Sequence, residues 1–132
     1  KSLALDKYDA DAYAFRGMIR YLKKDFKDAV ADYDEALRLV GKRADLYVNR
    51  GIARYEMNDL QGAMSDYDAV VALDEDNVVA RFNRGLLRME VGNWNGAEQD
   101  FAHLLEIIFQ TVFLEFQTNG LQEAVLKVVQ VP

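Results

Sequence analysis

The chain has no cysteine, one histidine and one proline among its 132 residues. Without cysteine, disulfide bonds, thiolate metal sites and cysteine nucleophiles are excluded. The proline is the last residue, Pro132, so no predicted helix is interrupted by a proline ring. The lone His103 cannot make a paired-histidine metal site, and we expect it to face solvent on a helix. These absences leave few groups from which an active site could be built.

Basic residues are outnumbered by acidic ones. The chain carries 16 lysines and arginines against 22 aspartates and glutamates, which gives a formal net charge of -6. Nucleic-acid binding draws its affinity from clustered positive charge, so we expect no nucleic-acid partner. The apolar run at residues 107–116 is interrupted by Gln110 and Glu115. It is shorter than the ~20 apolar residues that span a bilayer. We therefore expect no membrane insertion, and the composition leaves the compartment open.

What the sequence does contain is self-similarity at a period of 34 residues. Glycines recur at this interval, each preceded by an arginine, and alanines and aromatic residues recur in step with them. The matched positions are Gly17, Gly51, Gly85; Ala29, Ala63, Ala97; and Tyr33, Tyr67, Phe101. Such a period over most of a chain is the signature of a helical repeat array, in which each unit buries its apolar face only against its neighbours.

Apolar residues at three-to-four spacing predict the helices within this period. We expect one helix from Ala10 to Leu22 and a second from Phe26 to Val40, with the pair recurring twice. Asp9 and Asp25 are the predicted N-caps of the first pair. Residues 1–9 read as the end of a preceding unit, because Leu3 stands one period before Leu37.

The pattern resembles the tetratricopeptide repeat over residues 1–111, and its Asn-Arg-Gly triplets are similar to a variant common in bacterial arrays. The matching residues are Tyr13, Gly17, Ala29, Tyr33, Ala36; Tyr47, Gly51, Ala63, Tyr67; and Gly85, Ala97, Phe101. The resemblance implies an all-α fold, a right-handed α-solenoid of about three helix-turn-helix units. Their approximate bounds are 10–43, 44–77 and 78–111, followed by a non-repeat tail at 112–132.

Each unit also repeats a set of charges. Two arginines four residues apart lie on one helix face, as in the pair Arg50 and Arg54, and an aspartate such as Asp66 recurs on the second helix. We predict a ladder of arginine–aspartate pairs between the two helices of each unit. This structural role outweighs ligand binding, because charges at a fixed repeat phase serve every unit equally.

The resemblance implies that the first helices line a concave groove that holds a peptide. The groove-facing positions would be Ala14, Met18, Tyr21, Val48, Asn49, Ile52, Tyr55, Phe82, Asn83, Leu86 and Met89. In the subclass of this family that grips a terminal carboxylate, the groove supplies lysine, asparagine and arginine. Here Ala14 and Met18 fill the lysine and asparagine positions, so we expect no carboxylate clamp. The same residues could instead pack internally or receive the tail.

The repeat stops after Leu105, and an apolar stretch follows that contains Phe109, Phe113 and Phe116. We interpret it as an extension of the last helix to about Phe116, with a strand as the alternative. A further short helix is expected over residues 121–129. Apolar surface of this kind has to be covered. The tail would either cap the open end of the array or pair with another copy or with repeats of a longer parent protein.

The sequence thus predicts a non-catalytic scaffold that binds a protein or peptide segment in an apolar groove. The alternative is a self-assembly module, possible as a homodimer through the tail, whose groove or open end is covered by its own or a partner's tail. An enzyme comes third, because no acid, base and nucleophile converge. No cofactor and no metal ion are implied.

Overall fold

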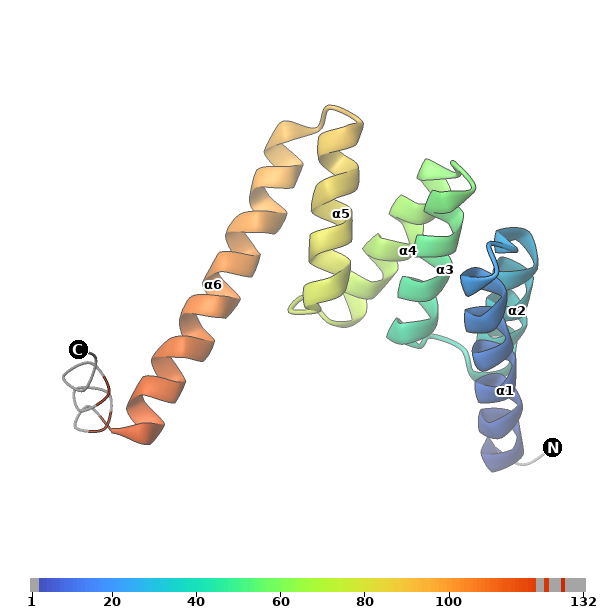
Figure 1. Ribbon diagram of the computed structural model, residues 1–132, viewed down its shortest axis with the longest axis horizontal. Helices are drawn as coiled ribbons and strands as arrows, with labels where there is room; N and C mark the ends of the chain where they lie inside the picture. The colour runs from blue at the N-terminus through green and yellow to red at the C-terminus, as the bar shows by residue number, and fades with distance from the viewer. Residues whose placement is uncertain (1–2, 121–122, 124–126, 128–132) are drawn as a thin grey trace.

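The computed structural model describes residues 3–120 together with Glu123 and Lys127, and all regular structure in this part is helical. The helices are α1 (Leu3–Leu22), α2 (Phe26–Val40), α3 (Ala44–Glu56), α4 (Leu60–Leu73), α5 (Val78–Glu90) and α6 (Trp94–Asn119). They form three antiparallel hairpins that follow one another in a row (Figure 1). The predicted all-α repeat array is confirmed.

The hairpins stack through α2 against α3 and through α4 against α5. Small residues make these contacts close: Ala29, Ala36 and Ala63 are fully buried. Tyr33 and Tyr67 fill the wider gaps and retain only 2% of their surface exposed. Burial raises the pKa of Tyr33 to about 12, and the charge of Asp32 adds to the effect. The core is therefore a series of similar layers, as expected where each unit contacts only its neighbours.

The periodic glycines are required by the aromatic rings of the second helices. A Cβ atom on Gly51 would lie 2.8 Å from Cε1 of Tyr67, and one on Gly85 would lie 2.9 Å from Cζ of Phe101. No side chain fits there unless the ring moves. The group that excludes a side chain at these glycines is the aromatic ring of the facing helix.

The two ends differ from the prediction. Helix α1 begins at Leu3, so residues 3–9 are continuous with the first helix and the predicted N-cap at Asp9 is wrong. No glycine or proline precedes Ala10 to interrupt this helix. Helix α6 runs to Asn119, beyond the expected Phe116, and is followed by Gly120 with a φ of 78°. The helix predicted over 121–129 lies outside the described residues.

Candidate functional site

A hollow of about 280 Å³ lies between the first and second hairpins, on the side formed by the first helices. It is lined by Met18, Tyr21 and Leu22 of α1, Tyr33 of α2, and Asn49 and Ile52 of α3. The side chains are mostly apolar, and no lysine or arginine is among them. We call this the first hollow.

A second hollow, also of about 280 Å³, lies between the second and third hairpins. Its lining includes the counterparts, one period later, of all six residues of the first hollow: Ile52, Tyr55, Glu56, Tyr67, Asn83 and Leu86. Tyr21, Leu87 and Glu90 complete it. Because Tyr21 and Ile52 line both hollows, the two are adjoining parts of one surface, which we call the groove.

Most of the predicted groove residues lie at this surface. Met18 and Leu86 are exposed by 46% and 44%, and Asn49, Ile52 and Tyr21 are half-buried. Phe82 and Met89 are exposed but line neither hollow, and the ring of Phe82 meets Phe101 edge-on, with centroids 6.2 Å apart. The Asn83 amide donates to the carbonyl of Val79, one turn earlier in α5.

Two of the predicted residues belong to the core. Ala14 and Val48 are each 7% exposed and lie in clusters of buried residues. Neither lines a hollow, so they are not part of the open surface of the groove.

The second hollow is acidic, which the sequence reasoning missed. Glu56 occupies the position that Leu22 holds in the first hollow, Glu90 is added from α5, and both glutamates are exposed. The Tyr55 hydroxyl donates to Oε2 of Glu90 at 2.7 Å, and this bond raises the pKa of Tyr55. Burial and the charge of Glu56 raise the pKa of Tyr21. The signal was available, since the two glutamates are 34 residues apart.

The predicted arginine–aspartate ladder is confirmed and holds each hairpin together. Asp66 is buried, and Arg50 donates to it from Nη2 at 2.7 Å and from Nε at 3.1 Å, while Arg54 adds Nη1 at 3.1 Å. The same arrangement surrounds Asp32 and Asp100. Paired in this way, a buried carboxylate keeps its hydrogen bonds.

The first arginine of a pair also ties one hairpin to the previous one. Nη1 of Arg50 lies 2.8 Å from Asp34, and Nη1 of Arg84 lies 3.0 Å from Asp68. These bonds join α3 to α2 and α5 to α4. The spacing of the hairpins, and with it the width of the groove, depends on these inter-hairpin bridges as well as on the apolar layers.

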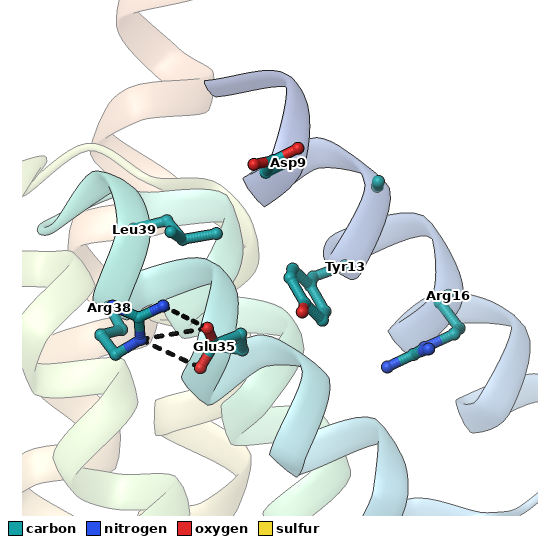
Figure 2. Close-up of a pocket in the computed structure, with 7 residues that line it drawn as sticks. Asp9, Tyr13, Arg16, Glu35, Arg38 and Leu39 are labelled. Carbon is teal, nitrogen blue, oxygen red and sulfur yellow. Dashed lines mark hydrogen bonds and ion pairs between the residues drawn. The ribbon is translucent and has the colours of Figure 1, made fainter. Parts of the chain in front are cut away.

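A larger hollow, of about 460 Å³, lies between α1 and α2 (Figure 2). It is lined in part by Tyr13, Arg16, Glu35 and Arg38. Arg38 is paired with Glu35, and Arg16 with Asp32. Helical spacing places Tyr13 and Arg16 on the opposite face of α1 from Met18. Because its charges are used in internal pairs, we do not assign this hollow to the site.

Within the described residues, no group of three or more histidine, cysteine, aspartate or glutamate side chains could hold a metal ion. His103, expected to face solvent, is half-buried, and its Nε2 lies 2.8 Å from Oδ1 of Asp76. No helix in the described part of the chain has the length and apolarity needed to cross a membrane.

The C-terminal half of α6 continues past the N-terminal end of α5, away from the other hairpins (Figure 1). Phe109, Phe113 and Phe116 lie there with 70%, 51% and 46% of their surfaces exposed. The rings of Phe109 and Phe113 stack with centroids 6.3 Å apart. None of the described residues of the tail lines either hollow.

The sequence profile described as Tetratricopeptide repeat matches residues 10–39 and 44–77. No curated protein sequence matches the chain. Among solved structures, the Arabidopsis OM64 TPR domain is 30% identical, with 80% of this chain and 87% of that one covered and a TM-score of 0.74. The second TPR of Spaghetti (RPAP3), solved with the HSP90 peptide SRMEEVD, is 27% identical, covers 76% and 94%, and has a TM-score of 0.72.

MamA shares the fold at 22% identity, with a TM-score of 0.76 and coverage of 83% of this chain and 64% of its own. The profile leaves the third hairpin unmatched, but the superposition on the OM64 domain extends over most of the array. The repeated glycines, the aromatic residues packed on them and the stacked hairpins agree with these likenesses. The chain belongs to the tetratricopeptide repeat family.

Proposed function

We propose that this chain is a non-catalytic protein-interaction scaffold that binds an extended peptide segment in the groove. The observation that carries the proposal is the repetition of one lining: six residues of the first hollow have counterparts in the second. Two adjoining hollows of equal size suit the successive side chains of one ligand. Concave surfaces with apolar and aromatic side chains are the usual places where such ligands bind.

Relatives of the same fold support a peptide as the ligand. The second TPR of Spaghetti (RPAP3) was solved with an HSP90 peptide, and the TPR2B domain of yeast Sti1 was solved as a pHsp70 complex, as their names state. The HSP90 peptide SRMEEVD is acidic. No lysine or arginine lines the groove of this chain, so an acidic ligand would meet no opposite charge there.

The test is selection from a displayed library of random nine-residue peptides. We expect the intact chain to enrich peptides above a protein-free control. Met18→Ser and Leu86→Ser, each at an exposed position in one hollow, should abolish most of the enrichment. The matched controls are Ile19→Ser and Val78→Ser, which remove exposed apolar side chains outside both hollows. Equal enrichment by all four variants would place binding elsewhere and refute the proposal.

A second candidate function, self-association through α6, is favoured by one substitution in the repeat. Asp34 and Asp68 bridge to the arginine of the next hairpin, but the third position of this series is Ala102. It begins an apolar stripe that continues through Leu105, Phe109 and the exposed residues beyond. The arginine of a further repeat would have no aspartate to pair with at this position, whereas an apolar helix could pack against the stripe.

Light scattering separates this candidate from a monomeric scaffold. The intact chain is expected to form a dimer that dissociates on dilution, whereas a version ended at Glu106 stays monomeric. Phe109→Ser should weaken the dimer, and Trp94→Ser, which removes an exposed aromatic residue from the start of the same helix, should not. A monomeric intact chain at all concentrations would exclude the candidate.

A further inference from the structure

The two hollows differ in charge. Leu22 of the first hollow is replaced by Glu56 in the second, and Glu90 of α5 adds a second carboxylate there that has no counterpart in the first. The other five positions of the first hollow keep their tyrosine, asparagine or aliphatic character in the second. If the groove holds one extended peptide, the two hollows therefore select different side chains.

We propose that the ligand is a segment with a bulky apolar side chain for the first hollow and a lysine or arginine for the second. This inference rests on the proposed function and specifies its ligand class. The first hollow offers Met18, Leu22 and Ile52 to the apolar side chain. The second offers two carboxylates beside a tyrosine wall.

The second hollow suits a cationic side chain in its geometry as well as in its net charge. Glu90 accepts a hydrogen bond from the Tyr55 hydroxyl, which holds its carboxylate against the aromatic ring and leaves lone pairs for another donor. A lysine or arginine has an apolar stem that can lie on Ile52 and Leu86, while its charged end reaches the carboxylates. Tyr21 and Tyr55 add ring faces that attract cations.

Acidic ligands are disfavoured by the same residues. The two glutamates repel a carboxylate, no basic residue lines either hollow, and the whole chain carries a net charge of -6. Arg50, Arg54 and Arg84 donate to buried or neighbouring aspartates instead. Their positive charge is committed to holding the hairpins together.

The spacing of the two ligand residues follows from helix packing. Packed helices lie about 8–10 Å apart, and α1 contacts α3 directly. A peptide in the polyproline II conformation advances about 3.1 Å per residue and returns a side chain to the same face at every third residue. Neighbouring hollows are therefore separated by about three residues of the ligand, so the expected pattern is an apolar residue and a basic residue at positions i and i+3, in either order.

The random nine-residue library described above also tests this inference. Peptides selected by the intact chain should show lysine or arginine three residues from a large apolar residue. The double variant Glu56→Gln and Glu90→Gln keeps the shape of the second hollow and removes its charge. It should still select the apolar residue but lose the basic one. Removing two glutamates of α6, by Glu98→Gln and Glu106→Gln, makes the same change in net charge and should leave the preference intact.

The contribution of the basic residue to the binding affinity is then measured with one selected peptide and a version of it in which glutamine replaces the basic residue. Calorimetry at low salt should show the basic peptide binding roughly threefold to tenfold more tightly, as expected for exposed charge pairs. The difference should shrink as salt rises and vanish with the double glutamine variant. Selection of peptides without a basic preference would overturn this inference but leave the proposed function standing. Failure to enrich any peptide would refute the proposed function itself.

Discussion

Three aspartates at equivalent positions, Asp32, Asp66 and Asp100, are buried although carboxylates are rarely found inside proteins. Each is tolerated because arginines of the facing helix donate to it: two for Asp32 and Asp66, and three for Asp100, where Arg81 adds to Arg84 and Arg88. The arginines keep some contact with water, with Arg50 and Arg54 exposed by 17% and 24% at their side chains. The cost of burying the pair is thereby reduced compared with a fully enclosed one.

Asp66→Asn should destabilise the chain by about 3 kcal/mol, because it leaves the two guanidinium groups without their buried counter-charge. Chemical denaturation followed by circular dichroism measures the free energy of unfolding. Asp68→Asn is the matched control: Asp68 is exposed and makes one bridge, to Arg84, so its loss should cost less than about 1 kcal/mol. Similar losses for both variants would show that the buried carboxylate carries no special weight.

Acid should destabilise the chain through Asp100. Burial by itself would raise the pKa of this carboxyl, but the hydrogen bonds and charge of Arg84, with Arg88 and Arg81, outweigh it and lower the pKa below the ordinary 3.8. Its contribution is therefore fully present well above pH 3.8 and is lost as the pH falls through the lowered pKa. Thermal melts between pH 6 and pH 2 should show this loss. Asp100→Asn should have a lower melting temperature than the original chain at pH 6 and should lose less of it on acidification. An equal loss of melting temperature in both proteins would contradict this role of Asp100.

At the scale of the helices, the turn inside each hairpin uses the left-handed region at one fixed position. Lys24, Asn58 and Gly92 stand there, one period apart, with φ of 66°, 63° and 83°. Glycine and asparagine tolerate this region and lysine does not. The first hairpin therefore carries backbone strain that the third avoids.

Lys24→Gly should stabilise the chain by about 0.5–1 kcal/mol, because it relieves a left-handed lysine at some cost in unfolded-state entropy. The change would appear as a higher midpoint of urea unfolding. Lys23→Gly is the control, since Lys23 is also exposed but does not adopt a positive φ. It should be neutral or destabilising, and a gain equal to that of Lys24→Gly would mean that removal of charge, not strain, was responsible.

The N-caps of the second helices differ between the hairpins, which the 34-residue period alone did not predict. Asp59 and Asn93 cap α4 and α6 by accepting from Gly62 and Gly96, as their period predicts. Asp25 lies at the same position before α2 but makes no side-chain capping bond. The residue three positions later is Asp28 instead of a glycine. A Cβ atom at Gly62 would collide with the capping carboxylate of Asp59, so the glycine permits the cap.

For the whole molecule, the inter-hairpin bridges and apolar layers make stability a sum over neighbouring units. The central hairpin, α3 and α4, has a neighbour on each side, whereas α1 and α2 have one. In α6, the part beyond Glu106 runs on past α5 with its large apolar side chains exposed. Opening should therefore begin at the two ends and reach the centre last.

Hydrogen exchange read by mass spectrometry tests this order at concentrations where the chain is monomeric. We expect the slowest amide exchange in α3 and α4, intermediate rates in α1, α2 and α5, and the fastest within the helices in the C-terminal half of α6. Breaking one inter-hairpin bridge with Asp34→Ala should speed exchange in α1 and α2 more than in α5. Uniform protection across the helices would show that the array unfolds as one cooperative unit instead.

The groove could be predicted only in part. Met18, Tyr21, Ile52, Tyr55, Asn83 and Leu86 were placed in it by the resemblance to the tetratricopeptide repeat, and all of them line a hollow. Phe82 and Met89 were placed there in the same way but line neither hollow. Ala14 and Val48 share that helix face but are covered by neighbouring hairpins, which spacing along one helix does not show. Glu56 and Glu90 were missed because exposed charges on a repeat usually belong to solvated surface.

The sequence alone determined the helical period, the small and aromatic residues that must meet, and the pairing of arginine with aspartate, because each depends on residue types at a fixed interval. Only the tertiary structure decided which side chains remain open to a ligand and that α6 extends beyond the array. Those features depend on how far neighbouring hairpins overlap, and this distance is set by contacts between residues that lie in different repeats.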